Sequence, residues 1–365
     1  MINVDRAQVM AYRVTALGLA ERVDVRAADL PVLDLGIQQY TPDSAQVALT
    51  ARSSAEPADD RLAPVWAARG APHLHRRSDL AALTSQLWPL TDADAATRIN
   101  SAQIPDAGAL GMRAFTVTAE AFREVVTGPI ARGAASTEVS KRVPGELTYQ
   151  CRGCGARHIA GNVWQQAGLA GGVEVLSRGK DALLGPLPDA PALPGANAGI
   201  DRLIATYLRF LGPAGPGEVA KYLGSSPAQI RKVWPSAGLT EVHIDGRKAW
   251  LPDTEVPALQ SARTAPGVRW LPGMDPLLQA RDRDVLIPER AAQKEVWRSL
   301  GNPGVLLVDS EIAGVWRARL VGRKRVDLTV TAFNGLSAAR RKQADQEAAQ
   351  VARARGVPEA TVTYE

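Results

Sequence analysis

Apolar residues recur at helical spacing in several stretches of the chain, and a pattern typical of a β-hairpin follows most of them. The clearest stretch is 201–251, where three short helical patterns precede two alternating strands. The first of these helices has an apolar face made of Leu203, Ile204, Tyr207, Leu208 and Leu211. Because this spacing follows the 3.6-residue period of an α-helix, the face is expected to pack into a core.

The third helix and the hairpin of this stretch have clear start and turn signals. Ser226-Pro227 supplies a cap and a proline suited to the first helical turn. The helix is expected to bury Ile230 and Trp234 while Gln229 faces solvent. Asp245-Gly246 separates the two strands and suits the type I′ turn of a tight hairpin. Three helices followed by a hairpin make a winged helix, whose third helix can enter a DNA major groove.

One phrase occurs twice in the chain. Residues 163–169 and 233–239 share the pattern V-W-x-x-A-G-L, and a hairpin pattern follows each copy. Self-similarity of this kind indicates a supersecondary unit that is used more than once. A more divergent copy is expected before both. The sequence therefore predicts three winged-helix units, at residues 1–90, 91–187 and 196–260, with a proline-rich linker before the third.

The pattern changes after residue 260. Turn residues separate short β-type runs, which lie at 270–287, 304–309, 312–321 and 325–332. Four or more such runs predict a small barrel or a curled sheet. A long helix capped by Asn334 and a last strand at 360–364 complete this region. The predicted fold class is α+β, with three tandem winged-helix units followed by a small β-barrel-like C-terminal domain at 261–365.

Charge and composition agree with a nucleic-acid partner. The 365 residues carry a formal net charge of +5, and the sequence pI is about 9.3. This balance suits DNA binding and also fits an ordinary arginine-rich protein. There is no apolar run of membrane length and no signal-peptide core, so a cytoplasmic protein without a membrane partner is expected. Three tandem units supply several DNA contacts in one chain, which favours a monomer.

Basic residues gather on the predicted hairpins and on one helix. His73 and His75 alternate on a strand with Arg77, so their side chains are expected on one face. That face either contacts DNA or forms a solvated basic edge. The other candidates lie at the wing turns and on the third helix of the last unit. The predicted DNA-binding residues are His73, His75, Arg76, Arg77, Arg178, Lys180, Arg231, Lys232, Arg247 and Lys248.

The order of parts and several phrases resemble a known family. The phrases are R-G-A-P-H-L-H at 69–75, L-P-G-M-D at 271–275 and G-V-W-R at 314–317. Over nearly its whole length the chain resembles the AlkZ-like/YcaQ-like winged-helix DNA-binding family. The resemblance implies a DNA glycosylase that excises alkylated purines or unhooks interstrand crosslinks in double-stranded DNA, without a cofactor or a metal.

The resemblance also implies where the catalytic residues lie. The family signature is a glutamine, an apolar residue and then a second glutamine or an aspartate, within the first winged helix. Gln38, Gln39 and Tyr40 stand at these three positions. Gln38 is expected to hold a water against the anomeric carbon, with Gln39 or Tyr40 assisting. Tyr40 departs from the signature, since its hydroxyl is a poorer acceptor than a carboxamide or a carboxylate.

A cysteine-containing insertion in the second unit has a possible zinc spacing. Cys151, Cys154 and His158 are residue types that zinc binds, but a closed site needs a fourth ligand, and the other histidines belong to other units. A turn with partly buried thiols is therefore expected, and no metal site is predicted.

Two further sets of polar residues have competing interpretations. Gln165 and Gln166 lie on the outer part of a candidate recognition helix, where glutamine can pair with adenine. Asp275, Asp282 and Asp284 are acidic residues in a basic region. Neither a partner base nor a metal cluster accompanies the three aspartates, so turn and salt-bridge roles are expected for them.

The sequence leaves three classes of function open. The first is a winged-helix protein that engages duplex DNA and excises alkylated or crosslinked purines. The second is a non-catalytic DNA-binding protein, either a transcriptional regulator or a protein that sequesters lesions. The third is a protein-interaction module, for which no salt-dependent DNA affinity is expected.

Overall fold

The chain folds into two compact units. The computed structural model describes residues 2–153, 155–179 and 182–365. Unit 1 gathers Met1–Asp60, Ala205–Glu218 and Pro235–Glu365, and unit 2 gathers Arg61–Ile204 and Val219–Trp234. These units do not coincide with four consecutive domains, since the first 60 residues pack with the C-terminal part of the chain. The division into repeated winged-helix units stays a prediction.

The helices are mostly short, and their order follows the sequence patterns closely. They are α1 (Arg6–Ala16), α2 (Ser44–Thr50), α3 (Leu80–Leu87), α4 (Asp92–Ile99), α5 (Arg113–Val125), α6 (Arg132–Ser140), α7 (Gly161–Ala167), α8 (Ile200–Leu211), α9 (Pro216–Leu223), α10 (Pro227–Lys232), α11 (Val256–Ser261), α12 (Arg283–Leu286), α13 (Arg290–Val296) and α14 (Ala338–Ala354). In the described part of the chain, none of these helices has the length and apolar character needed to span a bilayer.

The strands form small sheets and one larger sheet. They are β1 (Ile2–Val4), β2 (Ile37–Gln38), β3 (Leu62–Trp66), β4 (Pro72–Arg76), β5 (Ile130–Ala131), β6 (Thr148–Gln150), β7 (Arg157–Ile159), β8 (Val173–Val175), β9 (Leu183–Pro186), β10 (Leu239–Ile244), β11 (Arg247–Pro252), β12 (Val268–Leu271), β13 (Gly304–Val308), β14 (Glu311–Val321), β15 (Arg325–Ala332) and β16 (Glu359–Tyr364).

One part of unit 1 is built on the β10–β11 hairpin. The turn at Asp245-Gly246 has φ values of 46° and 81°, which are the positive values that a type I′ turn requires at both central positions. The hairpin prediction is therefore confirmed. Strand β1 adds to β10 in parallel, an addition that the sequence pattern did not indicate. Helix α1 covers this sheet and buries Val9 and Tyr12 against Val242 and its neighbours.

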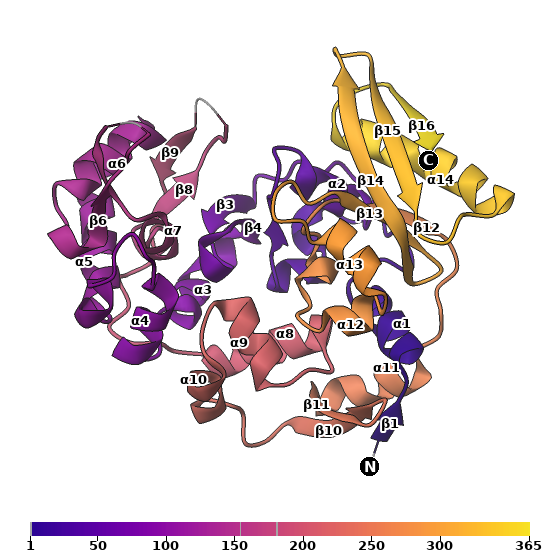
Figure 1. Ribbon diagram of the computed structural model, residues 1–365, viewed down its shortest axis with the longest axis horizontal. Helices are drawn as coiled ribbons and strands as arrows, with labels where there is room; N and C mark the ends of the chain where they lie inside the picture. The colour runs from indigo at the N-terminus through magenta and orange to yellow at the C-terminus, as the bar shows by residue number, and fades with distance from the viewer. Residues whose placement is uncertain (1, 154, 180–181) are drawn as a thin grey trace. The chain divides into compact units, whose positions relative to one another are not determined.

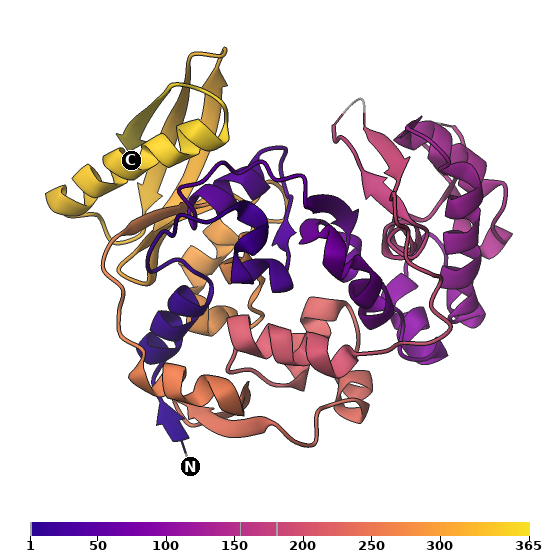
Figure 2. The same ribbon diagram turned by 180° about the vertical axis from the view of Figure 1, so that it is seen from behind.

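The other part of unit 1 is a five-stranded sheet in the order β12-β13-β14-β15-β16. Helix α14 lies along one face of it (Figures 1 and 2) and buries Ala344, Ala348 and Val351 there. Among the described residues β12 and β16 each pair with one neighbour, so the sheet is open rather than a closed barrel. Strands β15 and β16 are parallel because α14 carries the chain back across the sheet.

Two local predictions in this region are wrong. The β-type run at 270–287 ends as a strand at Leu271 and continues as a 3₁₀ helix, Pro276–Gln279, and as α12. Proline at the start of the 3₁₀ helix and the Asp275 side chain, which caps it, favour this outcome over a strand. The cap of α14 is Ser337, whose side chain accepts from the Arg340 amide, rather than Asn334.

Unit 2 has an aromatic core. Trp164 on α7 contacts Phe122 on α5 with ring centroids 4.3 Å apart, and Trp66 on β3 lies 5.9 Å from Trp164. The predicted burial of Trp164 is confirmed, at 3% exposure. Strands β3 and β4 pair antiparallel, as do β8 and β9, and β6 with β7 forms the hairpin of the cysteine-containing insertion.

Candidate active site

The first glutamine of the predicted signature lies in a mostly buried position of unit 1. Gln38 ends β2 and is 8% exposed. Its Oε1 accepts a hydrogen bond of 2.9 Å from Nε2 of Gln279, a residue that is 3% exposed. The sequence positions of the two glutamines differ by 241, so only the folded chain brings them together.

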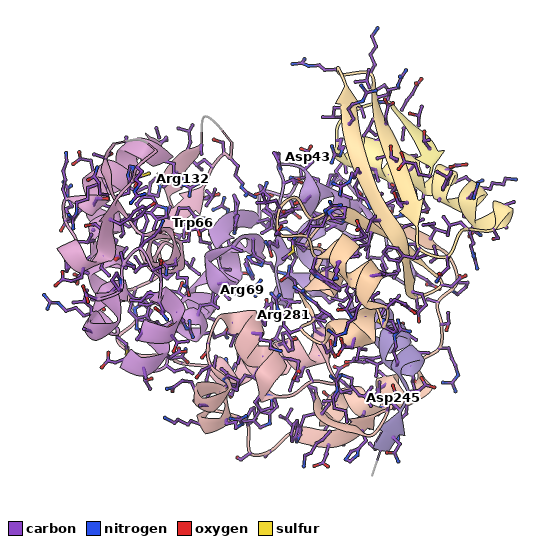
Figure 3. The ribbon with its side chains drawn as sticks, in the orientation of Figure 1. Asp43, Trp66, Arg69, Arg132, Asp245 and Arg281 are labelled. Atoms are coloured by element: carbon purple, nitrogen blue, oxygen red, sulfur yellow. The ribbon has the colours of Figure 1, made fainter. Side chains whose placement is uncertain are left out.

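Gln279 is held by two further hydrogen bonds. Its Nε2 also donates to the Met274 carbonyl oxygen at 3.1 Å, and its Oε1 accepts from Nη2 of Arg281 at 3.1 Å. Figure 3 labels Arg281, which lies between the 3₁₀ helix Pro276–Gln279 and α12. The two carboxamides therefore belong to one hydrogen-bonded chain that runs from Arg281 to Gln38.

The loop 272–275 connects this pair to the third residue of the signature. Tyr40 accepts a hydrogen bond of 3.1 Å at its hydroxyl from the backbone amide of Asn302. The side chain of Asn302 donates to Sδ of Met274 at 3.4 Å. A Cβ atom on Gly273 would lie 2.6 Å from the Asn302 carbonyl oxygen, so the loop approaches Asn302 more closely than any other residue type permits.

One buried ion pair fixes the loop 272–275 to the end of the helix that follows the signature, and a second joins α1 to the start of α12. Arg52, just beyond α2, donates to both carboxylate oxygens of Asp275 at 2.9 Å, and both side chains are 0% exposed. Asp282 accepts from Arg13 at 2.9 and 2.6 Å, also in the interior. The predicted salt-bridge roles of Asp275 and Asp282 are thus confirmed.

A pocket of about 530 Å³ lies beside Tyr40 in unit 1. Its lining includes Tyr40, Ser44, Pro272, Asn302, Arg317 and Arg355. Figure 3 labels Asp43 at the start of α2, and its Oδ2 forms an ion pair with Nη1 of Arg355 at 4.0 Å. The pocket therefore has a mixed polar and apolar lining that includes two arginines, and it lies next to the signature.

The structure buries the two histidines that were predicted to contact DNA. His73 and His75 are 2% and 3% exposed, so their side chains do not form a surface for phosphates in this structure. Nδ1 of His73 lies 2.8 Å from the Ala71 carbonyl oxygen. Burial, with a smaller contribution from His75, lowers the pKa of His73 to about 3. The expectation of a solvated, basic edge is wrong because β4 packs both imidazoles inward.

The neighbouring arginines of this hairpin are held in ion pairs. Arg76 pairs with Asp79 at 3.1 Å, and Arg77 pairs with Glu174 on β8 at 2.7 Å. At the β8–β9 turn Arg178 is exposed, and desolvation with the charge of Arg132 lowers its pKa. Lys180 lies outside the described residues.

The remaining predicted DNA contacts are exposed. Arg231 and Lys232 on α10 are exposed as predicted, and Arg247 and Lys248 begin β11, next to the hairpin turn where Figure 3 labels Asp245. Lys248 forms an ion pair with Glu241, and Arg247 lies 3.6 Å from Asp282.

Two expectations for α10 are wrong. Gln229 is 9% exposed because its Oε1 accepts from Thr91 at 3.3 Å. Trp234 is only half-buried, since α10 ends at Lys232.

The outer face of α7 is covered within unit 2. A Cβ atom on Gly70, in the β3–β4 turn, would lie 2.7 Å from Cβ of Gln165. Gln166 donates from Nε2 to the Arg98 carbonyl oxygen at 3.0 Å. The β3–β4 turn therefore occupies the face that a recognition helix would present to DNA, and the prediction that Gln165 and Gln166 contact bases is not supported.

The possible zinc spacing falls partly outside the described residues, because Cys154 is not among them. Cys151 directly follows β6, and His158 is the middle residue of β7, where it pairs with Tyr149. Within the described ranges, no group of three or more His, Cys, Asp or Glu residues is placed to hold a metal ion.

Sequence analysis missed Gln279, Arg281 and Asn302. The L-P-G-M-D phrase was noticed, yet it gave no signal that Gln279, four residues after it, returns to the first signature glutamine. Glycine at 273 and the aspartate at 275 were the only local hints, since both are residue types that tight loops favour.

The fold and the site together define a mixed α+β protein with helix–hairpin elements and a site that contains two hydrogen-bonded carboxamides. The DNA glycosylase AlkZ-like family model matches residues 32–354, so the chain belongs to the AlkZ-like DNA glycosylase family. The interstrand DNA cross-link repair glycosylase of Streptomyces sahachiroi is 32% identical over 175 residues. That alignment covers 45% of this chain and 45% of the relative, which is less than half of either.

A solved structure extends the likeness to the whole fold. The Streptomyces sahachiroi DNA glycosylase AlkZ superposes with a TM-score of 0.74, and the match covers 100% of both chains at 23% identity. At this level of identity the likeness establishes the mixed α+β fold.

Proposed function

We propose that the protein is a monofunctional DNA glycosylase that excises alkylated or crosslinked purines from duplex DNA. Membership of the AlkZ-like family and the name of the Streptomyces sahachiroi relative support this class of activity. The observation that carries the proposal is the Gln38 carboxamide, which a hydrogen bond from Gln279 holds in a defined orientation two residues before Tyr40. Tyr40 itself lines a pocket of about 530 Å³.

The proposed reaction needs only water. Gln38 Oε1 accepts a hydrogen bond from a water molecule and holds the water oxygen against the anomeric carbon. As the bond from that carbon to the base breaks, its electron pair leaves with the base, and an alkylated base that was cationic departs neutral. The water oxygen bonds to the anomeric carbon and releases a proton to solvent. Gln39 or Tyr40 assists, and the Tyr40 side chain, whose hydroxyl accepts from the Asn302 amide, lines the pocket.

The proposed DNA contacts follow from the winged-helix pattern. We assign three tandem winged-helix units and a C-terminal β-rich domain, with phosphates contacted by exposed cations of the third unit. These cations are Arg231, Lys232, Arg247 and Lys248. The protein is proposed to act as a monomer on double-stranded DNA.

The proposal is tested by measuring the release of 7-methylguanine from alkylated duplex DNA. We expect release by the wild type and a loss of roughly 100-fold or more in Gln38→Ala, because the water loses its positioning group. Gln293→Ala is the matched control, since Gln293 also carries a hydrogen-bonded carboxamide in unit 1. Equal rates for wild type and Gln38→Ala would contradict the assignment of Gln38.

The second candidate is a non-catalytic DNA-binding protein. The presence of Tyr40 where the signature has glutamine or aspartate favours it, because a tyrosine hydroxyl is a poorer acceptor. Under this alternative, the wild type releases no base but retains DNA binding that weakens as the salt concentration rises.

A further inference from the structure

We propose that Gln279 is a positioning residue that fixes the carboxamide of Gln38 in the orientation required for base excision. The orientation follows from the hydrogen bonds around the two side chains. Its effect on the reaction rests on the proposed glycosylase function. The inference therefore has a structural part and a kinetic part, and each can be measured.

Two neighbouring groups determine how the Gln279 carboxamide is oriented: one can only accept a hydrogen bond, and the other can only donate one. The Met274 carbonyl can only accept, and its oxygen lies 3.1 Å from Nε2 of Gln279. The Arg281 guanidinium can only donate, and its Nη2 lies 3.1 Å from Oε1 of Gln279. A carboxamide turned by 180° would place oxygen against oxygen at Met274 and N–H against N–H at Arg281. Both contacts therefore select the same orientation.

This orientation is transmitted to Gln38. Because Nε2 of Gln279 points at Gln38 from 2.9 Å, the atom of Gln38 that faces it must be the acceptor Oε1. Both side chains are buried, so solvent does not compensate for a mismatched pair. One lone pair of Oε1 is then occupied, and the second lone pair and the Nε2 group are directed away from Gln279.

The second lone pair is the one that can hold the water of the proposed reaction. A carboxamide that flips would place a donor where this acceptor stands, and a donor cannot accept a hydrogen bond from the water. A reacting atom misplaced by about 1 Å can reduce a rate roughly 100-fold. Gln279 thus supplies to the site, from a distant part of the chain, a second carboxamide that the signature itself lacks at Tyr40.

The kinetic test uses single-turnover release of 7-methylguanine by three variants. Gln279→Met keeps the side-chain length without the carboxamide, and we expect the excision rate to fall at least 10-fold with the Kd for alkylated duplex unchanged. The same substitution in the Gln38→Ala background is expected to cause no further loss, because Gln279 acts through Gln38. Gln293→Met, which removes a carboxamide elsewhere in unit 1, is expected to retain the wild-type rate.

Gln279→Glu provides a readout that a packing role would not give. An ionised carboxylate cannot donate to Gln38 Oε1, whereas a protonated carboxyl can. Relative to the wild type at each pH, the rate of this variant is expected to rise as the pH falls and the introduced carboxylate is protonated. Arg281, which donates to Gln279, is the charged group that holds this carboxylate ionised at neutral pH. A constant ratio across the pH range would overturn the positioning role.

The structural part is measured without activity. In protein labelled with ¹⁵N at glutamine side chains, the Nε2 signal of Gln38 is identified by its loss in Gln38→Ala. Gln279→Met is expected to shift that signal and leave the Gln293 signal in place. An unchanged Gln38 signal would overturn the inference, whatever the enzyme does. Absence of base release by the wild type, with the shift present, would instead overturn the proposed function and the kinetic part.

Discussion

His73 illustrates how one buried residue changes the interpretation of a basic segment. As an exposed strand residue it would carry a variable charge near DNA, but the structure buries it, with Nδ1 directed at the Ala71 carbonyl. A neutral imidazole with one donor and one acceptor suits this environment better than an imidazolium. The residue is therefore a structural histidine, and its titration bears on stability rather than on DNA binding.

We predict that His73 makes the protein less stable in mild acid. Burial lowers the pKa of His73 from 6.5 to about 3. Below pH 6.5 His73 is therefore protonated in the unfolded chain but stays neutral in the folded chain. The stabilisation is complete above pH 6.5 and is lost as the pH falls towards 3. Between pH 7.5 and 5.0 the wild type should lose about 2 kcal/mol more unfolding free energy than His73→Gln. Urea denaturation at the two pH values measures this difference, and equal losses would contradict it.

At the scale of elements, the candidate site is assembled by the loop 272–275. This loop contacts Gln279 through Met274, approaches Asn302 at Gly273 and is anchored to the end of α2 through Asp275. Met274 has a φ of 65°, a conformation that non-glycine residues rarely adopt, so surrounding contacts must hold it there. The carbonyl that orients Gln279 therefore depends on the anchoring of the whole loop.

We predict that Asp275→Asn destabilises unit 1 strongly. The substitution leaves the Arg52 guanidinium buried without a counter-charge, which typically costs about 3–5 kcal/mol. The double variant Arg52→Met with Asp275→Asn should lose much less than the sum of the two single variants Arg52→Met and Asp275→Asn, because neither charge is then left buried alone. Urea unfolding of the single and double variants gives the coupling, and strictly additive losses would show that the pair is not the anchor.

At the scale of the whole molecule, the described surface keeps only some of the cations that were predicted to contact DNA. Several of the predicted basic contacts are buried or held in ion pairs, including Arg76 with Asp79 and Arg77 with Glu174. Arg231 and Lys232 are the adjacent exposed cations of α10. Phosphate contacts by such side chains release counterions, and this makes the binding sensitive to salt.

We predict that the double variant Arg231→Ala, Lys232→Ala binds duplex DNA more weakly and with less salt dependence. The slope of log K against log salt should fall in magnitude by about 1 for each side chain that contacts a phosphate. The control is the double variant Lys294→Ala, Arg298→Ala, which removes one exposed charge within α13 and one just after it. The slope of log K against log salt should be unchanged in this control. Fluorescence anisotropy over a series of salt concentrations measures both, and equal slopes in the two variants would exclude α10 from the interface.

The sequence by itself determined the local elements of this protein. The Asp245-Gly246 turn, the cap at Ser226, the buried Trp164 and strands β13 to β16 of the C-terminal sheet all depend on residues that are neighbours in the chain, so their patterns were sufficient. The position of Gln38 followed from a family resemblance rather than from such a pattern.

Only the tertiary structure decided which of these residues meet. It paired Gln38 with Gln279, joined Arg52 to Asp275, covered α7 with the turn at Gly70 and turned His73 inward. Each of these outcomes depends on packing between distant segments, where burial and hydrogen-bond direction select a partner that no local pattern specifies. Local sequence patterns therefore predict the elements, whereas tertiary packing determines which residues surround the candidate site.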